Sequence, residues 1–171
     1  MAELTRKELI LALISASEHP RLSGVDLSGL DLEHLDFHGV DLSGADLSGC
    51  GLHRANFRGA HLVRANLTEA DLTHADLGKA RLDHAMLYKA RLDEAVLDGA
   101  DMTHALLKWA ALPGARLQEV NFSHALLDRA DFSGADLRGS NFQNATWIGA
   151  VWKGAHIQHI HGGPALRDTL G

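Results

Sequence analysis

A large apolar side chain occupies every fifth position of this chain from Leu22 to Ile157. The run contains 28 consecutive repeats without a gap, and all five Phe residues lie on these positions. Two residues before each large apolar position a small side chain recurs, which is Ala in 20 of the 28 repeats. A fold for this chain must therefore bury one large and one small side chain from every repeat.

A period of five fits neither of the regular elements. In an α-helix, residues five apart are about 140° apart around the axis, so the large side chains form no stripe. In a straight strand they alternate between opposite faces. Residues 80–117 are rich in helix-forming Ala, Leu, Lys and Arg, but the same period continues through the Gly-rich and Asp-rich residues 39–51. The pattern instead predicts a chain that turns a corner in every repeat, with the large and small side chains pointing into a coil.

Several repeats resemble the units of the pentapeptide-repeat family. They include Ala-Asp-Leu-Ser-Gly at 45–49, Ala-Asn-Leu-Thr-Glu at 65–69 and Ala-Asp-Leu-Arg-Gly at 135–139, and 14 of the 28 repeats have Asp or Asn just before the large residue. The resemblance covers about four fifths of the chain. It implies an all-β solenoid, a right-handed quadrilateral β-helix with four repeats in each coil. The 28 repeats would then form about seven coils, and the rod would be ~34 Å long at strand spacing.

The repeat divides the chain into three parts. We expect an N-terminal helical cap at residues 1–19, the β-helix at 20–159, and a C-terminal cap or tail at 160–171 that covers the last coil or exchanges onto a second copy. Phe142, Trp147 and Trp152 occupy late large apolar positions and are expected to plug the C-terminal end.

The N-terminal segment has the spacing of a capping box, with Thr5 followed three residues later by Glu8. This predicts a helix that runs to about Ser17, with Leu9, Ile10, Leu13 and Ile14 along one side. The alternative is a signal peptide, because two basic residues precede an apolar run. The acidic residues in the segment favour the helical cap, and the apolar run is too short for a membrane span.

Composition fits a single domain without a disulfide. The chain has 171 residues, a net charge of -6 and one cysteine, Cys50, which lies at a small, inward position. A buried thiol there fits a reducing compartment, so we expect a cytoplasmic protein. Phosphate loops, nucleophile elbows and zinc-protease motifs are absent from the sequence. We therefore expect no cofactor and no enzymatic activity.

The first repeats carry carboxylates without Lys or Arg between residues 25 and 49. This acidic collar could bind a basic partner or an ion. Alternatively, the short carboxylates bond the backbone at the corners, since five of the six precede a large apolar position. The acidic collar consists of Asp26, Asp31, Glu33, Asp36, Asp41 and Asp46.

If four repeats make a coil, residues 20 apart lie above one another. His84, His104 and His124 then form a histidine column on one face. Imidazoles at strand spacing could bind a metal ion, but no carboxylate or thiolate in the column completes a site. A solvated polar ladder is the favoured interpretation.

A neighbouring face is apolar where an outward residue is expected. Residues 86, 106 and 126 stack there as Met, Leu and Leu, and the two aromatic residues outside the large apolar positions lie on the same face. A contiguous apolar patch with charged neighbours indicates a protein interface. We call it the apolar face, and it consists of Met86, Tyr88, Leu106, Trp109, Leu126 and Ile148.

Two functions of different kinds follow. The first is a non-enzymatic interaction rod, a scaffold or effector, whose apolar face binds an unknown protein partner or a second copy in a homodimer. The second comes from the resemblance, since some pentapeptide-repeat proteins are acidic rods that mimic DNA, bind DNA gyrase and confer quinolone resistance. This chain has no loop that interrupts the repeat, and beyond the first coils it is only weakly acidic. Neither function involves direct contact with nucleic acid or membrane.

Overall fold

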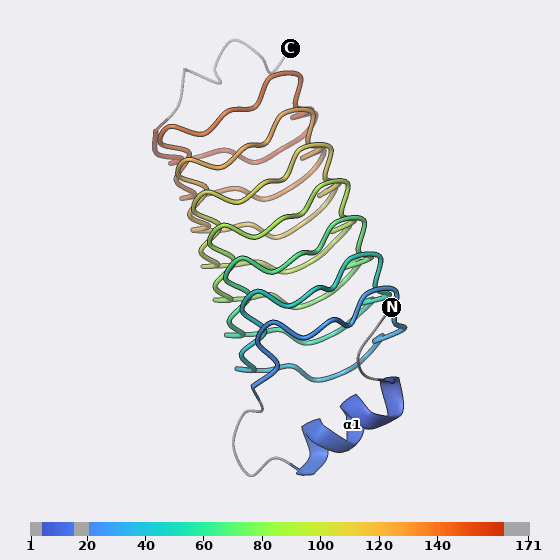
Figure 1. Cartoon of the computed structure of the whole chain (residues 1–171). Helices are drawn as coiled ribbons and strands as arrows, with labels where there is room; N and C mark the ends of the chain where they lie inside the picture. Colours follow the sequence, from blue (N-terminus) through green and yellow to red (C-terminus); the bar gives the residue numbers. More distant parts are fainter. Residues whose placement is uncertain (1–4, 16–20, 163–171) are drawn as a thin grey trace.

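Parallel backbone bridges connect residues that lie 20 positions apart, as in the series Asp26, Asp46, Asn66, Met86. The computed structural model describes residues 5–15 and 21–162. Because 20 residues are four repeats, each coil has four sides, and the coils stack into a rod with helix α1 at its N-terminal end (Figure 1). Stacking with four repeats per coil is therefore as expected. The right-handed sense of the coil stays a prediction.

The expectation of an all-β fold needs one correction. The bridges are isolated, and the described residues contain no strand longer than a single bridged residue. The reason is the length of the repeat, because two of its five residues form a turn and too few remain for an extended strand. The solenoid is thus held by ladders of single bridges rather than by sheets.

Each corner is a β-turn with one residue in the left-handed region. In a typical repeat, the backbone N–H of Ala45 donates to the carbonyl of Leu42 at 3.0 Å, and Gly44 between them has φ +68°. The equivalent residue has positive φ in every repeat, and in 16 of them it is not glycine. Left-handed backbone is unfavourable for most side chains. Trp109, with φ +64°, is a bulky example.

Along each side of the coil, backbone N–H and carbonyl groups both form hydrogen bonds to neighbouring coils. Leu27 donates to the carbonyl of Asp46 at 2.8 Å, and Asp46 donates back to the carbonyl of Val25 at 2.9 Å. The same pattern continues along the rod. The coils are therefore joined through their backbone along every side.

The interior is filled by the large apolar residues, of which 26 of 28 are buried. Aromatic rings stack from coil to coil, with 4.8 Å between the ring centroids of Phe37 and Phe57 and 4.7 Å between those of Phe132 and Trp152. At the C-terminal end Trp152 is buried, whereas Trp147 and Ile157 are only partly buried. The expected aromatic plug is thus present, although Trp147 contributes only part of its surface.

Two polar residues replace Ala at the small positions and are satisfied internally. Ser140 donates to the carbonyl of Leu117 at 2.5 Å and accepts from the N–H of Val120 at 3.2 Å. The Cys50 thiol lies 3.0 Å from the carbonyl of Leu27, and burial raises its pKa to about 11. The thiol is buried as expected and is poorly suited to nucleophilic chemistry.

Helix α1 (Arg6–Ser15) covers the N-terminal end of the rod. The capping box is present, since the N–H of Thr5 donates to Glu8 Oε2 at 2.8 Å and the N–H of Glu8 donates to Thr5 Oγ1 at 3.3 Å. Leu9 is buried in the core and Leu13 packs against it, while Ile10 is half-buried.

Arg6 ties this helix to the first coil. Its guanidinium donates to the carbonyl of Asp31 at 2.7 Å and to that of Glu33 at 3.3 Å, and it also lies 2.7 Å from the Asp31 carboxylate. The side chain of Ile14, the predicted extension to Ser17 and the tail from 163 to 171 lie outside the described residues. In the described ranges, no helix has the length and hydropathy needed to cross a membrane.

We predict that Leu92→Asp unfolds the middle coils. Leu92 is fully buried, and an unpaired carboxylate in the core costs several kcal/mol, which is comparable to the roughly 5–15 kcal/mol stability of a domain. Circular dichroism and urea denaturation measure the effect. Leu92→Met is the control, because it conserves volume and should cost less than about 1.5 kcal/mol. A small effect of the Asp variant would mean that the large apolar positions are not the core.

Candidate protein-binding face

The residue before each large apolar position stabilises the corner when it is Asp or Asn. All 14 such residues accept a hydrogen bond at Oδ1 from the backbone N–H two residues later. Some also connect coils, as Asn66 does by donating to Asp46 Oδ1 at 3.0 Å. This position is therefore a structural one in half of the repeats.

Five residues of the acidic collar make this bond, which confirms the structural interpretation of their spacing. Hydrogen bonding lowers the pKa of Asp26, through the Ser28 hydroxyl first, and that of Asp31, through the backbone N–H of Glu33 first. The sixth residue, Glu33, follows its large apolar position instead. A further role of the collar in binding stays a prediction.

The apolar face lies where the carboxylate and amide pattern stops. Met86, Leu106 and Leu126 are bridged to one another in three successive coils, and 38–42% of each side chain is exposed. The described chain exposes eight large hydrophobic residues, and six of them form the apolar face. The other two are Leu11 in α1 and Val151 at the adjoining corner. All six residues that were predicted for this face are exposed, and the structure brings three of them, Met86, Leu106 and Leu126, into one column.

The stacked apolar residues of this face lack two properties that Asp and Asn provide at the same position of the repeat. Met86, Leu106 and Leu126 cannot accept the hydrogen bond that Asn66 accepts from the N–H of Thr68 one coil earlier. They also expose apolar surface where the carboxylates and amides of other repeats are hydrated. Neither feature helps the rod to fold.

Cationic side chains hold the two aromatic residues of this face. The guanidinium of Arg129 lies 4.5 Å from the ring centroid of Trp109, and Nζ of Lys89 lies 5.2 Å from that of Tyr88. Lys89 is also 3.4 Å from a carboxylate oxygen of Glu69. Aromatic side chains oriented in this way are frequent anchors of protein interfaces.

The histidine column lies beside the apolar face, separated from it by one Ala in each coil. Its rings stack with centroid distances of 4.8 Å for His84 and His104 and 4.7 Å for His104 and His124. Asn144 continues the column, 3.5 Å from Nε2 of His124. Parallel rings at this spacing do not converge on one ion, whose bonds to nitrogen are about 2.0–2.1 Å long. The described residues contain no group of three or more ligands suited to a metal, and the interpretation of the column as a solvated polar ladder stays a prediction.

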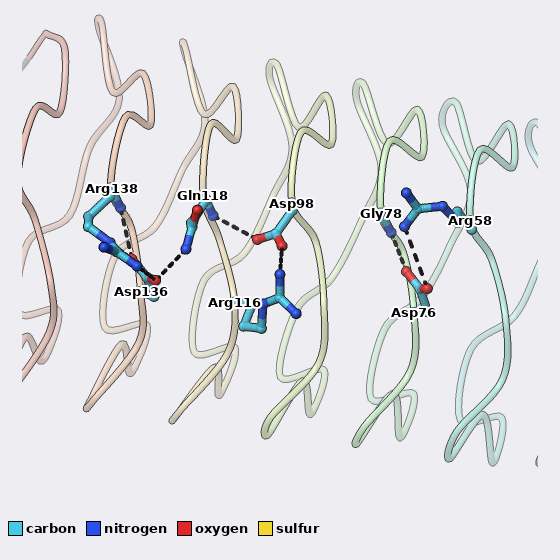
Figure 2. Close-up of polar contacts among 8 residues, drawn as sticks. All are labelled: Arg58, Asp76, Gly78, Asp98, Arg116, Gln118, Asp136 and Arg138. Atoms are coloured by element: carbon cyan, nitrogen blue, oxygen red, sulfur yellow. Dashed lines mark hydrogen bonds and ion pairs between the residues drawn. The ribbon is translucent and has the colours of Figure 1, made fainter.

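The opposite face of the rod is polar and pairs its charges internally (Figure 2). Asp98 pairs with Arg116 and accepts from the N–H of Gln118, whose side chain donates to Asp136 at 2.6 Å. The adjacent Arg138 holds the pKa of Asp136 well below its ordinary range. These charges are used within the face, in contrast to the apolar surface on the other side.

The family description "Pentapeptide repeats" matches eight copies within residues 21–54, 50–87, 76–112 and 115–146. The chain belongs to the pentapeptide-repeat family. The matched segments include every residue of the apolar face except Ile148. No curated protein sequence matches the chain significantly.

The chain is also similar to several solved structures. The pentapeptide-repeat protein Rfr23 from the cyanobacterium Cyanothece 51142 is 30% identical over 52% of this chain and 60% of that one, with a TM-score of 0.51. HetL, involved in heterocyst differentiation regulation in Nostoc sp. strain PCC 7120, is 26% identical over 90% of this chain and 95% of its own, with a TM-score of 0.47. QnrB1, a plasmid-mediated fluoroquinolone resistance protein, is 23% identical over 86% of each chain, with a TM-score of 0.41.

Sequence reasoning missed the conflict between the apolar face and the corner. The sequence predicted that the Asp residues of the acidic collar bond the corners, but the loss of this bond at Met86, Leu106 and Leu126 was not recognised. The signal that could have found it is the abrupt change from Asn66 to Met86 within one column.

We predict that Leu106→Asn makes the rod more stable. The new Oδ1 can accept from the N–H of Lys108, and such a bond contributes about 1 kcal/mol. Urea denaturation measures the change in the free energy of unfolding. Val96→Asn is the matched control, because Val96 has the same position in its repeat on the opposite face. Loss of stability in the Leu106 variant alone would mean that Leu106 serves the fold.

Proposed function

We propose that this protein is an interaction rod that acts by binding and not by catalysis, with the apolar face as its binding surface. The partner is another protein or a second copy of the chain. The observation that carries the proposal is the stack of Met86, Leu106 and Leu126, which is exposed in three successive coils at the position that Asp or Asn fills in 14 of the 28 repeats.

The form of the rod supports this role. In the described coils the interior is occupied by the chain's own large side chains, whereas substrates usually bind in a concave pocket. We infer that the coil is the right-handed quadrilateral β-helix of the family, since four repeats close each turn. A rod of this kind offers flat, rigid faces, and rigidity lowers the entropic cost of binding.

Residue composition also supports an interface. Trp109 and Tyr88 give it two aromatic anchors, and Arg129 and Lys89 lie over their rings. The arrangement has an apolar centre and charged edges, as interfaces between separately folded proteins do.

The test compares capture of proteins from native lysate by four versions of the chain. These are the wild type, Leu106→Glu, Leu106→Asn and the opposite-face control Val96→Glu. We expect a partner that is retained by the wild type and the control and lost by both Leu106 variants. Its affinity for the purified proteins is then measured by calorimetry.

Leu106→Asn makes this experiment selective. The variant is expected to be more stable than the wild type, so loss of binding cannot be attributed to unfolding. A partner that binds all four versions equally would refute the apolar face as the site. Sedimentation of the wild type and the same variants tests self-association in the same way.

The acidic collar supports a second candidate function, a DNA mimic that binds DNA gyrase. Its carboxylates are arranged in register in successive coils, as Asp26 and Asp46 are. After Asp136, however, the described chain has no Asp or Glu, so the negative charge covers only part of the rod.

We predict that a gyrase-binding chain would inhibit supercoiling by purified gyrase at micromolar or lower concentration. Asp26→Asn with Asp46→Asn should weaken this inhibition while keeping the corner hydrogen bonds, because Asn can accept the same bond. Supercoiling that continues unchanged in the presence of the wild type would exclude this function.

A further inference from the structure

We propose that the partner of the apolar face is an acidic amphipathic helix that lies along the axis of the rod, with one helical turn over each coil. This inference rests on the proposed function and specifies the chemistry of the partner. It follows from the backbone of the face, the spacing of its apolar residues and the charges beside them.

The backbone of the apolar column is already paired at Met86 and Leu106. Met86 donates to the carbonyl of Ala65, and its own carbonyl accepts from Leu67 at 2.7 Å. Leu106 likewise donates to Ala85 and accepts from Leu87. A partner strand would find no unpaired edge here, so the face must be recognised through side chains.

The spacing of the apolar column suits a helix. Successive coils are separated by the bridge spacing of about 4.8 Å, and one turn of an α-helix rises about 5.4 Å. Over three coils the difference accumulates to only about 1–2 Å. A helix parallel to the rod can thus place one apolar residue from each turn on Met86, Leu106 and Leu126.

The charges beside the apolar column, on the side away from the histidine column, are mainly positive. Lys89, Lys108 and Arg129 carry three positive charges, and Asp128 and Glu69 carry two negative charges, of which Glu69 pairs with Lys89 at 3.4 Å. The Asp128 carboxylate also accepts a hydrogen bond from the N–H of Ile148 at 2.8 Å. This region is therefore locally cationic in a chain whose net charge is -6, and carboxylates on the partner would complement it.

The histidine column provides the other flank. His84, His104 and His124 run parallel to the apolar column, and histidine side chains gain charge as the pH falls through the range around 6. Like charges that are 4.7–4.8 Å apart repel one another, and carboxylates of a bound helix would relieve this repulsion. Binding should therefore tighten at acidic pH.

Other charged groups on this side of the rod modify but do not reverse the effect. Arg64 precedes the column and Asn144 follows it. The histidine column has further charged or titratable neighbours on the same side of the rod. In the coils of the histidines and in the coil before them, these are His61, Arg81, Asp83 and Asp101. Asp83 pairs with Arg81 at 3.6 Å, and Asp101 accepts from the Thr103 hydroxyl at 2.5 Å. Both carboxylates thus have partners of their own.

The same charges disfavour a second copy as the occupant. Contact between two apolar faces would set one cationic region against another and, at low pH, one histidine column against another. An acidic helix meets the same apolar column without this repulsion.

The experiment uses two synthetic peptides of about four helical turns. Both carry Leu at the first, fifth, eighth and twelfth positions, and their flanking positions carry Glu in one peptide and Lys in the other. Fluorescence anisotropy of the labelled peptides measures binding to the full-length protein. We expect the Glu peptide to bind at least about tenfold more tightly than the Lys peptide. Leu106→Asn should abolish this binding, and Val96→Asn should leave it unchanged.

The pH arm tests the histidine flank. Between about pH 7.5 and about pH 5.5, where Glu stays ionised, the affinity for the Glu peptide should rise at least about threefold. The triple variant His84→Gln, His104→Gln, His124→Gln should lose this rise and keep the affinity at the higher pH. A rise that persists in the triple variant would overturn the role of the histidines.

Three results would overturn the proposal as a whole. They are equal binding of the two peptides, preference for the Lys peptide, and a dimer of the wild type that Leu106→Asn disrupts. If a lysate partner is still lost from the Leu106 variants, the proposed interaction function stands and only the acidic helix is refuted. If the Glu peptide binds through Leu106 but no lysate protein does, the preference of the face for an acidic helix stands. The proposed function, binding of a cellular protein by this face, is then refuted.

Discussion

The left-handed residue at each corner is the constraint on which the rest of the rod depends. A chain that turns after every five residues needs a β-turn in each repeat, and this turn needs positive φ at its third residue. Every repeat meets the requirement, in 16 cases with a side chain other than glycine. The turn directs the large and small residues inward and brings residues 20 apart into register. Burial of the inward side chains and the bonds between coils then stabilise the turn.

The side chain before the large apolar residue has a second, local role. Where it is Asp or Asn it completes the hydrogen bonding of the corner, and where it is apolar it does not. The two functional candidates thus use one position with opposite chemistry. In the acidic collar, binding and folding call for the same residues. On the apolar face, folding favours Asp or Asn whereas the proposed binding requires an apolar residue. Only there can one substitution change stability and binding in opposite directions.

Much of the architecture was predictable from the sequence, because a period of five admits few geometries. The buried large positions, the capping box at Thr5 and the buried Cys50 followed from spacing, and the coil length followed from the resemblance to the pentapeptide-repeat family. The isolated bridges were not expected, because the sequence does not show how many residues each turn takes. The apolar face was predicted from Met86, Leu106 and Leu126, since a 20-residue coil aligns them. The stacking of His104 on its neighbours depended on side-chain orientation, which spacing leaves open.

The contact of Arg6 with the first coil has a consequence for assembly. A stack of identical coils has no intrinsic length, and carbonyls at an uncovered end can accept another chain as readily as they accept the next coil. Such head-to-tail contacts do not close, and they generate filaments. Arg6 occupies the carbonyls of Asp31 and Glu33, and Leu9 lies over the core beside them. Helix α1 therefore removes two acceptors that a head-to-tail contact at the N-terminal end of the rod would use.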